Sequence, residues 1–245
     1  MDTRILALEL GGVVLVYAAL AGRNRRWPLM STAAFLSGVA VLAIALVSPV
    51  HGLSERVLSW HMAQHVLIVS LAAPLLASGR PIDLLLARGG RRRARREVGT
   101  NAVVASAILQ VGGMLAWHVP TFFDAAVRHP RLHEAEHATM LLTAFVFWDT
   151  VIRLDAAHRG GAVVALFVVT LPAMAYGVAL TLARTPWYET YRAGDALSHQ
   201  QLAGVVMWAY GGLAAVVGGV TLGVAWMRSL ERSSPSLGPV HRGLS

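Results

Sequence analysis

The sequence contains no cysteine and no lysine, and only 14% of its residues are charged. Without cysteine the chain has no disulfide, no thiolate metal ligand and no cysteine nucleophile. Because lysine is absent, arginine supplies all 21 basic residues. Hydrophobic residues make up 56% of the chain. So much apolar sequence with so little charge is typical of an integral membrane protein.

Seven apolar stretches are long enough to cross the roughly 30 Å hydrocarbon layer of a membrane. We therefore predict an all-α fold, with a single transmembrane bundle over residues 1–232 and a disordered cytoplasmic tail over residues 233–245. The predicted spans cover residues 5–21, 29–48, 56–77, 99–118, 134–152, 161–183 and 201–227. A cleaved signal peptide is the alternative for the first stretch. For residues 80–97 we predict either a short interfacial helix or a solvated basic loop.

The arginines predict how the bundle is oriented. Fifteen of the 21 lie in the connections after the first, third and fifth spans and in the tail, and the other six lie on the opposite side. Because positive loops stay in the cytoplasm, the N-terminus is predicted outside and the C-terminus inside. The net charge of +8 then reports orientation and not a nucleic-acid-binding surface. We expect a multi-pass protein of the bacterial plasma membrane.

Histidines gather at one end of this predicted bundle. Eight of the ten belong to the outer ends of spans or to outer connections. Imidazole is a common metal ligand near neutral pH, and ionisable groups inside a membrane are candidates for function. The eight are His51, His61, His65, His118, His129, His133, His137 and His199.

Two histidine pairs have helical spacing. His61 and His65 are four residues apart in the third span, and His133 and His137 repeat this spacing at the start of the fifth. Residues four apart share a helix face, so each pair can reach one ion. The spacing predicts a metal site. Its expected core ligands are His61, His65, His133 and His137, with His118 and His199 as additional or transfer ligands.

Copper is the favoured metal. Met140 follows His137 by three residues, and Met114 precedes His118 by four. Thioether sulfur selects Cu(I), whereas imidazole alone suits copper, zinc and iron alike. Glu136 has two interpretations: it orients a ligand imidazole, or it is a solvated charge in the first turn of a helix.

Two other functions compete with a copper site. Residues 133–137 read His-Glu-Ala-Glu-His, which fits both the H-E-x-x-H and the inverted H-x-x-E-H pattern of zinc metalloproteases. No third-ligand motif follows, however. A membrane redox protein with bis-histidine haem is the other alternative, with Gly112 and Gly113 giving the ring room beside His118. The paired spacing fits a compact ion better than one axial ligand per helix.

Short motifs follow one another across five segments between residues 48 and 228. They are Ser59-Trp60-His61-Met62-Ala63-Gln64-His65, Ala73-Pro74-Leu75-Leu76, Gly79-Arg80-Pro81, Trp117-His118-Val119-Pro120, Glu136-His137, Trp187-Tyr188 and Gln200-Gln201-Leu202-Ala203-Gly204. In combination and order they resemble the CtaG family, the membrane assembly factors of caa3-type cytochrome c oxidase. One position departs from the family pattern, which more often has Asp where this chain has His199.

The resemblance implies a role in supplying copper to a haem–copper oxidase, or in maturing that oxidase. The expected partners are the lipid bilayer, oxidase subunits and copper chaperones, and no enzymatic activity is expected. The copper centres of such oxidases are reached from the outer side of the membrane. An outward-facing imidazole site agrees with that requirement.

Overall fold

The computed structural model describes residues 3–87, 97–154, 158–192 and 194–233. Within these ranges the regular structure is helical and no strand is present, apart from a single bridge between Val98 and Leu154. The all-α prediction is confirmed. The predicted tail lies outside the described residues, except for Ser233 at the end of the last helix.

Six helices are long and unbroken. They are α1 (Thr3–Arg23), α2 (Leu29–Leu46), α7 (Thr100–His118), α9 (Pro130–Arg153), α10 (Arg159–Leu182) and α12 (Gly211–Ser233). Two further rods contain a π-helical segment: α4 (Leu58–Val66), η1 (Leu67–Ala72) and α5 (Ala73–Ser78), and then α11 (Ala196–Val205) and η5 (Val206–Tyr210), which lead into α12. The short elements are α3 (Pro49–Ser54), α6 (Pro81–Leu86), α8 (Pro120–Arg128) and the 3-10 turn η4 (Glu189–Tyr191).

Six helical stretches of the described chain are long and apolar enough to cross a membrane. They correspond to six of the seven expected spans, and the expected span over residues 134–152 is not among them. That segment is helix α9, whose 24 residues extend over about 36 Å. Its length suits a span, but the histidines and glutamates of its first turns make it more polar than the others. The molecule is a multi-pass helical bundle, and the number seven stays a prediction.

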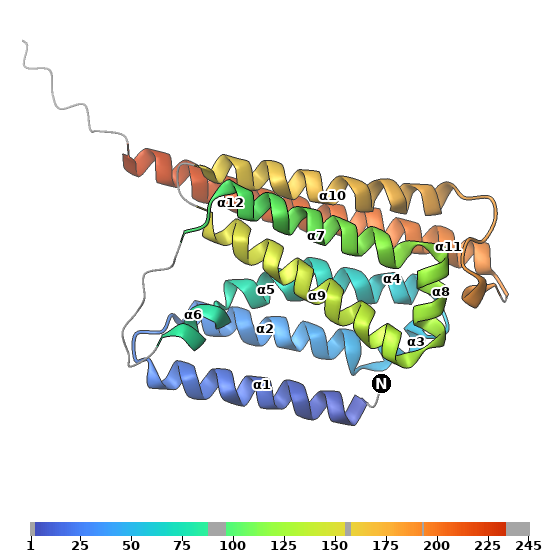
Figure 1. The fold of residues 1–245 in the computed structure, drawn as a ribbon, viewed down its shortest axis with the longest axis horizontal. Helices are drawn as coiled ribbons and strands as arrows, with labels where there is room; N and C mark the ends of the chain where they lie inside the picture. Colours follow the sequence, from blue (N-terminus) through green and yellow to red (C-terminus); the bar gives the residue numbers. More distant parts are fainter. Residues whose placement is uncertain (1–2, 88–96, 155–157, 193, 234–245) are drawn as a thin grey trace, which may run out of the picture.

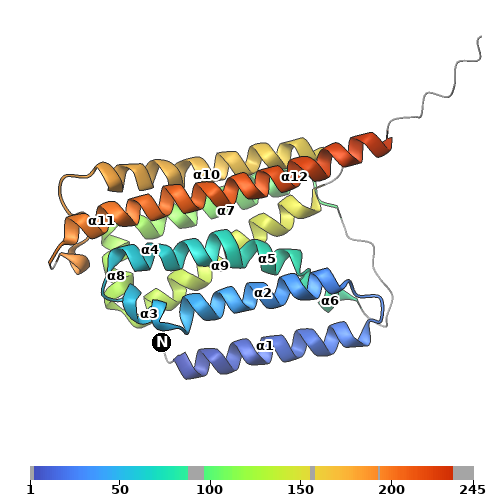
Figure 2. The ribbon, with the colours of Figure 1, turned by 180° about the vertical axis from the view of Figure 1, so that it is seen from behind.

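The long helices lie side by side along one axis, with α1 at the edge of the bundle next to α2 (Figure 1). Helix α9 slants through the bundle and contacts α7 and α5. Seen from behind, the α4–η1–α5 rod lies between α2 and the α11–η5–α12 rod (Figure 2). Helices α3, α8 and the start of α11 gather at one end of the bundle, and α6 lies at the other.

The connection between α7 and α9 contains the short helix α8. Val119 is extended, and Pro120 occupies the first helical turn, where its missing N–H costs nothing. Phe123, Asp124 and Ala126 are buried. The helix therefore forms because one of its faces packs on the bundle. At the opposite end, α6 accounts for residues 81–86 of the expected interfacial segment, and residues 88–96 lie outside the described part.

Close helix contacts depend on small residues. A Cβ atom added to Gly177 of α10 would lie 2.9 Å from the carbonyl oxygen of Gly204 in α11. These glycines let the two backbones approach, as small residues do between membrane helices. The approach fixes where the motif that ends at Gly204 sits relative to α10.

The end of the bundle that carries α6 is held by an ion network. Arg153 of α9 pairs with Asp83 of α6 at 3.1 Å and with Asp149 at 2.9 Å. Arg80 pairs with Asp83 at 2.8 Å. All four side chains are largely shielded from solvent. The network ties the short helix to the long slanting one.

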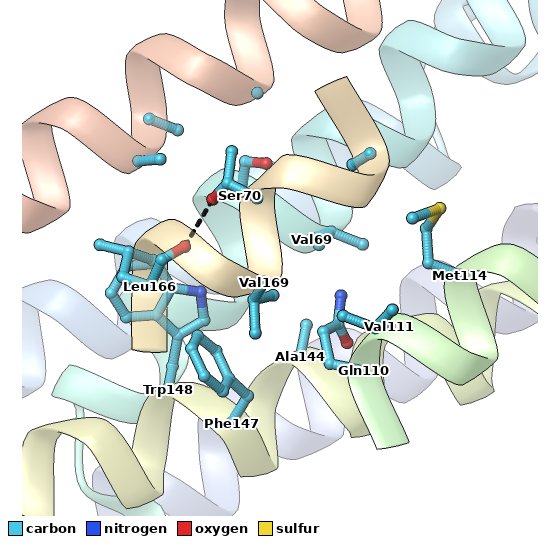
Figure 3. Close-up of a pocket in the computed structure, with 15 residues that line it drawn as sticks. Val69, Ser70, Gln110, Val111, Met114, Ala144, Phe147, Trp148, Leu166 and Val169 are labelled. Carbon is cyan, nitrogen blue, oxygen red and sulfur yellow. Dashed lines mark hydrogen bonds between the residues drawn. The ribbon is translucent and has the colours of Figure 1, made fainter. Parts of the chain in front are cut away.

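A small cavity of about 90 Å³ lies in the middle of the bundle. Figure 3 shows Gln110 and Met114 of α7 on one side of it and Phe147 and Trp148 of α9 on another. Gln110 is buried, and its Oε1 accepts a hydrogen bond from Thr143 at 2.7 Å.

Candidate metal centre

Three helices bring five histidines and one glutamate together at the end of the bundle that carries α3 and α8. Helix α4 contributes His61 and His65, and α7 ends with His118. Helix α9 contributes residues 133, 136 and 137, which share one helix face. All six side chains are buried, and Glu136 and His61 are completely inaccessible to solvent. The predicted meeting of the two histidine pairs is found in the structure.

Four of these residues form a compact ligand group. One donor atom from each of His61, His133, Glu136 and His137 lies within 4.8 Å of the donor atoms of the other three. The imidazole ring centres of His61 and His133 are 5.2 Å apart, and those of His133 and His137 are 4.3 Å apart. The group is therefore small enough to surround one ion.

The donor atoms of this cluster make no hydrogen bond within the protein. They are Nε2 of His61, His118, His133 and His137, both ring nitrogens of His65, and both carboxylate oxygens of Glu136. A buried polar atom left without a partner costs about 1–3 kcal/mol. Such a cost, repeated across one cluster, is expected where a metal ion supplies the missing interactions.

Hydrogen bonds beside the cluster fix how His61 presents its nitrogens. The Tyr191 hydroxyl donates to the carbonyl oxygen of Ser54 at 2.5 Å and lies 3.1 Å from Nδ1 of His61. Burial raises the pKa of Tyr191, so its hydroxyl stays protonated. The hydroxyl's only proton goes to Ser54, so Nδ1 of His61 is the donor to the tyrosine oxygen. Nε2 therefore keeps its lone pair for a metal.

His118 is oriented in the same way by the backbone. Its Nδ1 lies 2.8 Å from the carbonyl oxygen of Met114 and must donate to it. Its Nε2 is therefore unprotonated, and it is buried without a hydrogen-bond partner in the protein. The ring centre of His65 lies 5.6 Å from that of His118. The carbonyl of His118 accepts from Tyr176 at 2.6 Å and from Tyr188 at 3.1 Å.

A cover over the cluster comes from the connection between α10 and α11. The carboxylate of Asp124 accepts hydrogen bonds from the backbone N–H groups of Glu189 and Thr190 and from the Thr190 hydroxyl. Phe123 packs on the His61 ring, with 4.8 Å between centres, and on Tyr188 at 4.1 Å. Tyr188 is only 1% exposed, so its ring belongs to the packed cover and not to the surface of the bundle.

His51 of α3 lies beside the cluster. Its ring stacks with His133, with 6.1 Å between centres, and its Nδ1 lies 3.3 Å from Nε2 of Gln64. Gln64 also donates to the carbonyl oxygen of Ala45 at 2.8 Å. Burial lowers the pKa of His51, which keeps its imidazole neutral near pH 7. The residue borders the site without belonging to the four-residue group.

Three residues differ from their expected places. His65, expected as a core ligand, lies beside the group of four, with its ring centre 4.4 Å from that of His61. Glu136, one of whose interpretations was a solvated helix-start charge, is fully buried inside the ligand group. Sequence spacing allowed this, since Glu136 precedes His137 on the same helix, but acids in a first turn usually face water. His199 is half-buried on α11 and lies outside the group of four.

Residues 133–137 fit two metalloprotease patterns, and only the inverted one has its glutamate in the ligand group. Glu134, the base of the H-E-x-x-H form, is exposed and outside the group. Glu136, the glutamate of the inverted form, lies inside it. A direct zincin arrangement therefore has no support in this geometry.

The family model described as "Cytochrome c oxidase caa3 assembly factor (Caa3_CtaG)" matches residues 13–229. The chain is 26% identical to uncharacterized proteins of Mycobacterium bovis and Mycobacterium tuberculosis over 255 residues, which cover 90% of this chain and 38% of each relative. It thus spans less than half the length of these curated relatives. No solved structure matches it. On the family match, the chain belongs to the CtaG family of cytochrome c oxidase caa3 assembly factors.

Proposed function

We propose that this protein binds copper at the candidate metal centre and serves the maturation of a cytochrome c oxidase in the plasma membrane. The single observation that carries the proposal is the group of buried, unpartnered donor atoms on His61, His133, Glu136 and His137. Membership of an oxidase assembly family supplies the context. The copper is cargo, passed to oxidase subunits or received from chaperones, and the protein needs no enzymatic activity of its own.

The donor set supports copper without requiring it. Imidazole and carboxylate suit Cu(II) and Zn(II), and the order of intrinsic affinities favours copper. Buried Met114 and Met140 lie on the helices that supply His118 and His137. An assembly factor for a haem–copper oxidase has a direct use for copper. These arguments together favour copper as the ligand.

Haem fits the packing less well. The ring centre of His61 lies 4.4 Å from that of His65, and Phe123 covers the same ring. Side chains so close around a buried carboxylate leave room for an ion and not for a macrocycle. This geometry favours the compact metal site over bis-histidine haem.

The test is copper binding and oxidase activity of His61→Ala beside a matched control. We expect His61→Ala to lower copper affinity by at least about 100-fold, since even supporting groups of metal ligands contribute 10–100-fold. Oxidase activity should fall in cells that carry only this variant at normal membrane levels. His129→Ala changes an exposed histidine at the same end of the bundle and should match the wild type. Equal copper binding by the two variants would refute the proposal.

Absorption spectra of the purified protein separate the alternatives. A Soret band after purification would support haem. Bound zinc with peptide cleavage that depends on Glu136 would support the inverted metalloprotease pattern.

A further inference from the structure

The cluster holds more donor atoms than one ion can use. A tetrahedral ion takes four ligands, and the group of His61, His133, Glu136 and His137 already supplies four. Nε2 of His118, both ring nitrogens of His65 and one oxygen of Glu136 would still lack a partner. They are buried with the rest, so their demand for a partner is not met by bulk water.

Glu136 stands between two sets of histidines. Its Oε2 lies 3.8 Å from Nε2 of His61, and its Oε1 lies 3.7 Å from Nε2 of His65. The carboxylate thus points one oxygen at each of two imidazoles that are four residues apart on α4. The ring centre of His65 lies 5.4 Å from that of His137 and 5.6 Å from that of His118. Of these two, only His118 is outside the group of four.

The neighbouring protein groups leave these nitrogens available. Because Nδ1 of His118 donates to Met114, its Nε2 can only accept a proton or a metal. Neither nitrogen of His65 has a hydrogen-bond partner in the protein. Two imidazoles and a carboxylate are a sufficient protein set for an ion that completes its coordination with water or a transferred ligand.

We propose that the cluster is a two-metal centre in which Glu136 is shared. One ion takes His61, His133 and His137, and the second takes His65 and His118. The inference rests on the proposed function, because it assumes that the first site binds copper. Helical bundles hold paired metal ions by carboxylates and histidines that project from facing helices, and paired ions in protein sites lie about 3.5–4 Å apart.

Two adjacent sites provide a route by which copper can be transferred. The His65–His118 site draws on the ends of α4 and α7, and the first site draws on α4 and α9. A carboxylate with an oxygen toward each site lets an ion move without being released into water. It also allows two ions to be delivered together.

The experiment is a copper count on the full-length protein in detergent. Metal-free protein is saturated with Cu(II), desalted, and measured by elemental analysis and native mass spectrometry. We expect two copper ions per chain in the wild type and in His129→Ala, and one in His118→Ala. His118→Asn keeps a polar side chain toward Met114 and should also bind one, in case the alanine variant does not fold.

Spin counting tests whether the sites share a ligand. Two Cu(II) ions joined through Glu136 should couple and show fewer than two unpaired spins per chain by electron paramagnetic resonance. His118→Asn should give one full spin. One copper in the wild type, or two in the His118 variants, would overturn the two-metal proposal and leave the proposed function standing. Two copper ions with two full spins would overturn the sharing. No bound copper would instead defeat the proposed function.

Discussion

Single neighbouring groups decide which atoms of the cluster are open to a metal. Tyr191 forces Nδ1 of His61 to be a donor, and the Met114 carbonyl does the same for His118. In both cases the nitrogen that faces the cluster keeps its lone pair. The second partner of a metal-binding imidazole sets its tautomer and orientation, so these neighbours belong to the site as much as the ligands do.

Tyr191→Phe tests whether the hydrogen bond between Tyr191 and His61 supports metal binding. The substitution keeps the ring and removes the hydroxyl that holds His61. We expect copper affinity to fall by about 10–100-fold, the usual effect of removing such a supporting group. Competitive titration of the purified variant with a copper chelator measures the change.

The control for that experiment is Tyr210→Phe, because Tyr210 is exposed on η5. Loss of a buried hydrogen bond should also lower the stability of Tyr191→Phe by about 1–3 kcal/mol. A fall in the unfolding temperature with unchanged copper affinity would mean that Tyr191 only stabilises the fold.

At the scale of the elements, the sequence predicted the long helices and missed the short helices α3 and α8. Apolar stretches of membrane length are unambiguous in sequence. Helices α3 and α8 have only 6 and 9 residues, and isolated helices so short are not stable in water. They form because each buries side chains against the bundle, His51 and Ser54 in α3 and Phe123 and Ala126 in α8. No local pattern contains these contacts.

The site, too, was predicted only in part, because local sequence patterns do not contain the contacts between helices. Helical spacing identified the two histidine pairs, because the members of each pair share a helix face: His61 with His65, and His133 with His137. Helical spacing could not show that Glu136 is buried, because that burial depends on α4 packing across from α9. The cover formed by residues 188–191 was missed as well, because aromatic residues near a span end look like interfacial anchors. Tyr188 and Tyr191 instead point inward and bond buried groups.

Gly204→Ala tests the helix contact that supports this end of the bundle. The added methyl group would collide with the backbone of α10 around Gly177 and Thr181. Because backbone cannot move aside as a side chain can, we expect a loss of about 1–3 kcal/mol in the free energy of unfolding. The unfolding midpoint in detergent measures it.

Gly11→Ala is the matched control, since an added Cβ there meets nothing within 4 Å. Its effect should stay within about 0.5 kcal/mol of the wild type, as for other substitutions in open surroundings. Equal midpoints for the two variants would contradict a close approach of α10 and α11.

At the scale of the whole molecule, polar groups divide between the two ends. The histidine cluster and its covering connection occupy one end, and the ion network of Arg153, Asp83 and Asp149 occupies the other. Apolar helices and a small internal cavity lie between them. Such a division suits a protein that offers a site to one side of a membrane only.

Which side that is can be tested because the chain has no cysteine. Fifteen of 21 arginines are predicted to lie opposite the histidines, and positive loops remain in the cytoplasm. Single cysteines at Gly52 and Thr121, both exposed at the histidine end, should react with a membrane-impermeant thiol reagent in intact cells. A cysteine at the exposed Gly22, near the C-terminal end of α1 and at the opposite end of the bundle, should react only after lysis. The reverse pattern would place the metal centre in the cytoplasm and separate it from the outer copper centres of an oxidase.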